Sequence, residues 1–222
     1  IAAKLETELS GGAEKTAAVI TVLKELMSLH GNVVFGGDGY SAEWHEMAVK
    51  ERGLKNLPTS ADALPYLQDE SIVKLFESTG VLTPVELESR YEIYAEQYLL
   101  SIEVEAKLVV DIAKTLIYPA AISYLTELSA AGSGMENMGI TLDNATAKII
   151  AAEANAMMAA VVELSEAMEK ETFSSTEEHM QYVAKTIRAL MDKVRVHADT
   201  LECEVADILW PLPKYQEMLF IK

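Results

Sequence analysis

Histidine is the residue type in this chain with the widest range of chemistry, because its imidazole can bind metals or transfer protons near neutral pH. A di-iron centre in a helical bundle needs Glu-x-x-His motifs, which place both ligands on one helix face. The residues three positions before the histidines are Met, Ala, Thr and Val, and the single cysteine allows no zinc-binding spacing. The sequence therefore predicts no metal ligand among the four histidines, which are His30, His45, His179 and His197.

The sequence surroundings of the other candidate functional residues also favour structural roles. His197 lies in an apolar helical stripe, where a hydrogen-bonded packing residue is the commoner role. Cys203 stands between two glutamates, which do not activate a thiol, so we expect it to be packed. Residues 36–41 form a glycine-rich loop without dinucleotide or Walker spacing, which favours a turn over an anion site. Three tyrosines at helical spacing favour core or interface positions over a base-stacking platform. They are Tyr91, Tyr94 and Tyr98. We therefore predict no catalytic, cofactor-binding or metal-binding residue in this chain.

Amino-acid composition limits the binding partners and the cellular compartment that can be expected for this chain. The 222 residues carry 35 acidic against 18 Lys and Arg side chains, a formal charge of −17, which disfavours nucleic acid and anionic membranes. Half of the residues are apolar, so the chain can bury a core, and one cysteine cannot form an internal disulfide. No apolar run approaches the roughly 20 residues of a membrane span, and no secretory signal is visible. We expect a cytoplasmic protein, and a start at Ile1 within a helical pattern suggests a piece of a longer one.

The first part of the chain, residues 1–82, shows short helical patterns separated by glycine and proline. Val33–Phe35 is a short β-branched and aromatic run between glycines, so the fold contains at most one short strand, near 33–35. Ser41 suits the N-cap of a helix, and Ser60 or Asp62 opens another that stops at Pro65. Helices are expected over 1–10, 13–30, 41–52, 60–65 and 70–78.

Long helices are expected from residue 83 onwards. Thr83, Pro84 and Glu86 combine an N-cap, a proline at the first helical position and a capping-box glutamate. The apolar face that follows continues to Pro119, which should kink the helix, and resumes until 131–134. Its members are Leu87, Tyr91, Tyr94, Tyr98, Ile102, Ala106, Val109, Ala113 and Leu116, followed by Ile122 and Leu125. A second long helix is expected from Asp143 or Asn144 to about Lys170.

A third long helix should begin at a second capping box, Ser175 to Glu178. Its apolar residues recur in steps of three and four, the pattern that packs helices at about 20° in antiparallel bundles. They are Met180, Val183, Ile187, Leu190, Val194, His197, Leu201, Val205 and Ile208. Trp210–Pro213 ends the bundle, and the amphipathic tail 214–222 should dock onto a surface. The predicted fold is mainly α, with short helices followed by a long antiparallel helical bundle.

Five short sequence segments are more specific than helical periodicity. Together, and in their order along the chain, they resemble the C-terminal region of type III glutamine synthetase. They are GDGYSAEW at 37–44, RGLKNL at 52–57, DALP at 62–65, LESRYEIYAEQY at 87–98 and WPLPKYQEMLF at 210–220. The resemblance covers nearly the whole chain. It implies that 1–82 is the end of the catalytic-domain region and that 83–222 is the type III C-terminal extension, a long-helix bundle with a docked tail.

The resemblance also implies a parent enzyme that joins ammonia to glutamate with ATP and Mg or Mn, in a large ring-shaped homo-oligomer, a dodecamer by resemblance. The family's metal-binding and phosphoryl-binding motifs have no counterpart here, so no catalytic residue is carried onto this sequence. This segment should be inactive alone, with a structural, oligomer-contact or regulatory role beside the upstream catalytic domain. The alternative is an autonomous helical protein–protein interaction module without catalysis.

Overall fold

The computed structural model describes residues 1–170 and 172–219, and within these ranges every regular element is a helix. The prediction of a mainly α fold is therefore confirmed. The short strand allowed near 33–35 is not found, because Gly31–Val33 forms a 3-10 turn (η1) that extends the preceding helix. A lone strand here would have no neighbour to satisfy its backbone hydrogen bonds. The chain divides into two compact units, residues 1–56 and residues 57–222.

The first unit contains three helices, α1 (Ala2–Ser10), α2 (Lys15–His30) and α3 (Ala42–Lys50). Gly12, with φ +88°, turns the chain between α1 and α2, a conformation that glycine adopts without strain. The Ser41 side chain accepts a hydrogen bond from the Trp44 backbone N–H, which confirms the predicted cap of α3. The Phe35 and Trp44 rings stack with centroids 4.0 Å apart.

The second unit begins with short helical pieces, α4 (Ser60–Ala63), the 3-10 helix η2 (Leu64–Gln68) and α5 (Glu70–Ser78). Thr59, rather than Ser60 or Asp62, supplies the N-cap of α4, and the chain continues helically past Pro65. The side-chain amide of Gln181 donates to the Ala61 carbonyl at 3.1 Å and to Asp62 Oδ1 at 3.0 Å. These contacts join residues 57–82 to the long helices. The proposed boundary after 82 rests on the family resemblance, and it stays a prediction.

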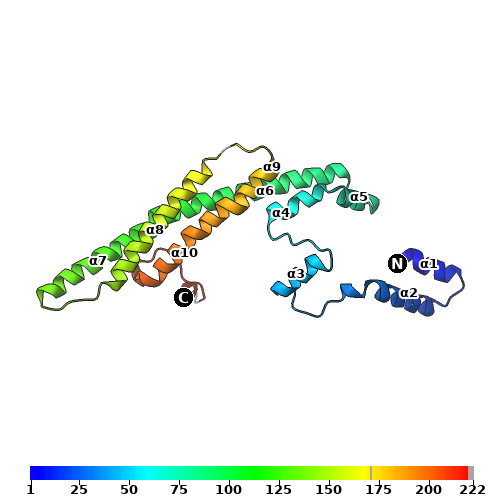
Figure 1. Cartoon of the computed structure of the whole chain (residues 1–222), viewed down its shortest axis with the longest axis horizontal. Coiled ribbons are helices and arrows are strands. Elements are labelled where there is room, and N and C mark those ends of the chain that lie inside the picture. Colours follow the sequence, from blue (N-terminus) through cyan, green and yellow to red (C-terminus); the bar gives the residue numbers. More distant parts are fainter. Residues whose placement is uncertain (171, 220–222) are drawn as a thin grey trace. The chain divides into compact units, whose positions relative to one another are not determined.

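Three long helical segments make up the rest of this unit. The first is continuous from Pro84 to Asn137 and consists of α6 (Pro84–Ile112), the π-helical turn η3 (Ala113–Ile117) and α7 (Tyr118–Asn137). The second is α8 (Ala145–Met168). The third consists of α9 (Thr176–Tyr182), the π-helical turn η4 (Val183–Ile187) and α10 (Arg188–Glu204). Figure 1 shows α8 and α10 lying alongside the first segment, and α8 contacts both α7 and α10.

The start of α6 confirms the predicted capping box. The Thr83 hydroxyl accepts from the Glu86 backbone N–H, and the Glu86 carboxylate accepts from the Thr83 backbone N–H at 2.8 Å. These bonds, with the Thr83 hydroxyl bond, lower the pKa of Glu86, because they stabilise its charged form. The cap thus satisfies backbone donors that the first helical turn leaves without partners.

The π-helical turn η3 changes the apolar face that periodicity predicts. An extra residue in this turn shifts the helical phase, so that Ile117 is 4% exposed whereas the predicted Leu116 is 41% exposed. Ala121 is fully buried, while the predicted Ile122 is 40% exposed. The turn ends at Ile117, two residues before Pro119, which lacks the N–H that a regular helix would use. Pro119 therefore lies in a continuous helix after a phase shift.

The predicted stop at 131–134 is wrong, because α7 continues through both glycines to Asn137. Glycine inside a helix weakens it by about 1 kcal/mol relative to alanine but does not end it. The chain turns at Gly139 instead, which has φ +78°. That left-handed conformation ends helices, and glycine adopts it without strain.

The main core lies between α8, α10 and the first long segment. On α8 the predicted Ile150, Met157, Val161 and Leu164 are all fully buried, whereas Ile149 is 41% exposed. The predicted face of the third segment holds at most of its positions, which are Met180, Val183, Ile187, Val194, Leu201 and Val205. Leu190 is only partly buried, and Ile208 is exposed because α10 ends at Glu204.

The docking of the tail after Trp210 stays a prediction. Trp210 itself is nearly buried, and Lys214 pairs with Asp207 at 2.5 Å. In the short helix α11 (Tyr215–Leu219), however, the side chains of Met218 and Leu219 are exposed. The last three residues of the predicted tail lie outside the described residues.

Two helical segments in the described chain are long and apolar enough to cross a membrane, by length and composition alone. They are Pro84–Asn137 and Ala145–Met168, with mean hydropathy 1.4 and 1.3 in their most apolar windows. This differs from the expectation that no apolar run approaches a membrane span. Core helices of soluble proteins pass the same criterion, and the inner face of α8 packs against α10.

Candidate functional site

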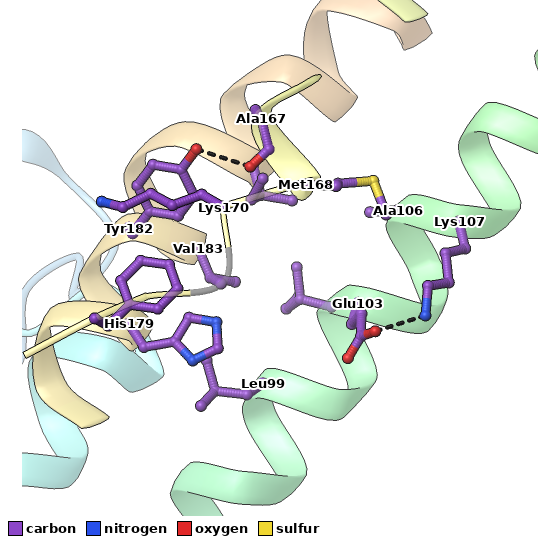
Figure 2. A pocket seen from close by; sticks show the side chains of 13 residues that line it. Leu99, Glu103, Ala106, Lys107, Ala167, Met168, Lys170, His179, Tyr182 and Val183 are labelled. Carbon is purple, nitrogen blue, oxygen red and sulfur yellow. Dashed lines mark hydrogen bonds and ion pairs between the residues drawn. The ribbon is translucent and has the colours of Figure 1, made fainter. Parts of the chain in front are cut away.

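A pocket of about 330 Å³ lies in the second unit, where α6, the end of α8 and the start of the third segment meet. Figure 2 shows residues of these three elements facing one another across it. Its apolar residues are Leu99, Ile102, Ala106, Ala167, Met168, Val183 and Ile187. The π-helical turn η4 contributes Val183 and Ile187, and such turns occur frequently at functional sites. Its volume is within the range of small-molecule sites.

One wall of the pocket is aromatic. The ring of Phe173 stacks on the imidazole of His179 with centroids 4.1 Å apart and planes 10° apart, and it meets Tyr182 at 5.3 Å. The Lys170 ammonium lies 4.6 Å from the Phe173 ring centroid and 4.5 Å from that of Tyr182, within the range of cation–π attraction. The Tyr182 hydroxyl donates to the Ala167 carbonyl at 2.9 Å, which ties the third segment to the end of α8.

The start of α9 is fixed by hydrogen bonds close to this wall. The Ser175 hydroxyl accepts from the Glu178 backbone N–H, as the predicted capping box requires. The Glu178 carboxylate, however, accepts from the Ser174 backbone N–H at 2.7 Å and the Ser174 hydroxyl at 2.5 Å, rather than from Ser175. The Ser174 hydroxyl and backbone N–H lower the pKa of Glu178, because they stabilise the carboxylate. The cap thereby holds Phe173 and His179 in place.

The electrostatics of the pocket centre on His179. Burial lowers the pKa of His179, because desolvation disfavours the imidazolium, while Glu103 opposes this effect and Lys170 adds to it. Across the pocket, Glu103 pairs with Lys107 at 2.5 Å (Figure 2). The arrangement offers an apolar hole with an imidazole at its edge. The described residues that line it include no Ser, Thr or Cys that a neighbouring base could activate as a nucleophile.

The four histidines are divided between the two units. His30 and His45 are exposed in the first unit, whereas His179 and His197 belong to the second. His197 is partly buried, and its Nδ1 lies 2.7 Å from Glu153 Oε2 on α8, so one ring nitrogen has a partner. Within the described residues, no three His, Cys, Asp or Glu side chains are placed to hold a metal ion.

Other singled-out residues have different surroundings. Cys203 is exposed, contrary to the expectation of a packed thiol, because Leu201 and Val205 occupy the inner face of this stretch. The loop 36–41 hydrogen-bonds within itself, with Tyr40 N–H donating to Asp38 Oδ1 at 2.9 Å, which supports a turn. Tyr91 is buried and Tyr98 partly buried, whereas Tyr94 is 43% exposed.

Sequence reasoning did not identify the pocket. Lys170, Phe173 and Tyr182 come from a connector and a helix start, and no motif links them to Glu103 on α6. A usable signal was Phe173, one of only four phenylalanines, in an otherwise polar stretch. An aromatic residue there indicates a packing contact.

Comparison with known proteins gives one consistent result. The glutamine synthetase C-terminal domain family model matches residues 18–136, just over half of the chain. The chain is 32% identical to the type-3 glutamine synthetase of Dictyostelium discoideum over 95% of its own length, and 31% identical to a glutamine synthetase of Bacteroides fragilis over 99%. A glutamine synthetase of Butyrivibrio fibrisolvens is 32% identical over 98%. The chain spans only 30–32% of the length of these relatives. It therefore belongs to the glutamine synthetase C-terminal domain family.

Proposed function

We propose that this chain is the C-terminal helical part of a type III glutamine synthetase, whose catalytic residues lie in the polypeptide upstream. The whole enzyme would ligate ammonia to glutamate with ATP. One observation carries the proposal: nearly the entire chain aligns with less than a third of each glutamine synthetase relative. The described residues accordingly offer a packed helical core and a pocket without an activated nucleophile.

The role proposed for this chain is structural. The three long segments would act as an antiparallel bundle that braces the catalytic domain and contributes to subunit contacts or regulation. Their shared core supports this role, because α8 and α10 pack along one another with fully buried side chains such as Met157, Leu164 and Leu201. A close-packed core of this kind would keep the bundle rigid while it contacts the catalytic domain or other subunits. The division into 1–82 and 83–222, with a docked tail, is part of this proposal.

The parent enzyme would use Mg or Mn with ATP, assemble as a homo-oligomer, dodecameric by resemblance, and work in the cytoplasm. The metal ions and ATP would bind outside this chain. Clustered carboxylates are what Mg²⁺ requires in such sites, and the described residues contain no such cluster. The alternative, an autonomous interaction module, is disfavoured because the match to glutamine synthetases covers 95–99% of the chain.

Activity and nucleotide binding test the proposal. The full-length parent should form glutamine from glutamate, ammonia and Mg-ATP, and the 222-residue chain should form none. Calorimetric titration of this chain with Mg-ATP should give no heat of binding at micromolar nucleotide. A parent without ligase activity would reject the assignment of the whole enzyme. Micromolar binding of Mg-ATP by the chain alone would show that the nucleotide site is not confined to the upstream part.

A further inference from the structure

The first compact unit lacks the core expected of a stable domain. Its 56 residues bury only three hydrophobic side chains, and all three are small or medium in size: Ala18, Val22 and Ala48. A unit of this size is marginal even with a well-filled core, because so little of its surface leaves water on folding. Something outside the unit must therefore contribute to its stability.

Helix α2 carries two apolar stripes, of which only one is used within the unit. Ala18 and Val22 face the unit's own core, and the ion pair between Lys4 and Glu25 ties α1 to α2. The other stripe has the spacing of a helix interface and consists of Ile20, Leu23 and Met27. These side chains are 47%, 52% and 55% exposed, and we call them the α2 face.

The charge of the chain is distributed unevenly between the two units. Residues 1–56 carry six Lys and Arg against eight Asp and Glu, so this unit is almost neutral. Residues 57–222 carry twelve against twenty-seven, which accounts for most of the −17. Unit 1 therefore carries the α2 face without strong electrostatic repulsion. Exposed apolar patches of this kind mark protein–protein contacts.

We propose that the α2 face docks onto an apolar surface of the upstream catalytic part of the same enzyme, and that unit 1 is the element that attaches the acidic helical unit to it. This inference rests on the proposed function, since it takes the remaining two-thirds of the relatives' length as part of the parent. The near-neutral charge of unit 1 lets it approach a protein surface closely.

A second copy of this chain is a poorer occupant. The upstream part is covalently attached, so its effective concentration at the α2 face is high without any further contact. Covalent attachment therefore favours the catalytic part over a second copy.

Hydrogen exchange in the full-length parent and in the 222-residue chain tests the docking. The backbone amides of α2 should exchange at least about 100-fold more slowly in the parent, because docking suppresses local opening. Amides of α8 and α10 should exchange equally in both proteins. In the parent, Leu23→Glu should remove most of the added protection, and the milder Met27→Gln should remove part of it.

Leu108→Glu is the matched control, because Leu108 is also a helical leucine that is 52% exposed but lies on α6. It should leave the α2 amides protected. Equal exchange of α2 in the parent and the chain alone would overturn the inference, as would equal losses from Leu23→Glu and Leu108→Glu. Protection that rises with the concentration of the isolated chain would identify a second copy instead, and would also overturn it.

The same samples separate this inference from the proposed function. A parent with protected α2 amides but no glutamine synthesis would reject the proposed activity and retain the docking surface. An active parent with unprotected α2 amides would reject the docking surface and retain the proposed activity.

Discussion

His179 differs from the other histidines in being stacked inside a pocket wall. Because burial lowers its folded pKa, the unfolded chain binds more protons as pH falls through the ordinary range of histidine, near the reference value of 6.5. His179 therefore costs no stability above that range and destabilises the fold as pH falls towards its folded pKa. Glu103 on α6 and Lys170 after α8 are the charged groups that influence it.

We expect the wild-type chain to lose more stability between about pH 7.5 and about pH 5 than His179→Asn does. Carboxylates with a lowered pKa, such as Asp62 and Glu178, also make the fold less stable as pH falls. Their contribution is the same in both proteins, so it cancels in the comparison. Urea unfolding at the two pH values measures the difference. Identical pH dependence in the two proteins would show that His179 keeps its ordinary protonation in the fold.

Leu201 provides the clearest packing prediction, because it is fully buried between α8 and α10. Leu201→Ala should lower the free energy of unfolding by about 2–5 kcal/mol, since it removes apolar surface and leaves a cavity. Leu190→Ala should cost less because Leu190 is only partly buried. The control Glu169→Gln, at an exposed position, should stay within about 0.5 kcal/mol. Similar values for Leu201→Ala and Glu169→Gln in urea titrations would contradict the observed helix register.

At the scale of elements, the capping box of α6 should determine how firmly the longest segment begins. Thr83→Ala removes a hydroxyl that accepts from the Glu86 backbone N–H, so it should cost about 0.5–2 kcal/mol. Thr126→Ala is a matched control, because the Thr126 hydroxyl only donates to the Ile122 carbonyl inside α7. Alanine is the better helix former there, so no loss is expected. Thermal unfolding, monitored by circular dichroism, measures the effect. Equal melting temperatures for Thr83→Ala and wild type would show that the cap assignment is wrong.

At the scale of the molecule, the two units should unfold separately. Each contains one of the two tryptophans, Trp44 in residues 1–56 and Trp210 in residues 57–222. The Trp210→Phe variant reports the first unit, and Trp44→Phe reports the second. In the 222-residue chain the Trp44 transition should occur at lower urea concentration, because its unit buries only three hydrophobic side chains. Coincident fluorescence transitions in the two variants would show that the units unfold as one.

The sequence by itself determined most of the helices, the caps of α3 and α6 and the overall charge. Caps such as Thr83–Glu86 and Ser41 act within one helical turn, so they are visible in a few consecutive residues. The spacing of Ile150, Met157 and Leu164 predicted a buried face, and the ordered phrases predicted the family.

Only the tertiary structure decided the phase of the long helices and the site. The π-helical turn η3 exchanges Leu116 for Ile117 on the buried face, because one extra residue in a turn rotates all that follows. The pocket joins Glu103 and His179, which share no local pattern, and the burial that lowers the pKa of His179 comes from packing between segments far apart in sequence. Local hydrogen bonds and periodicity are written in neighbouring residues, whereas burial depends on which distant faces meet.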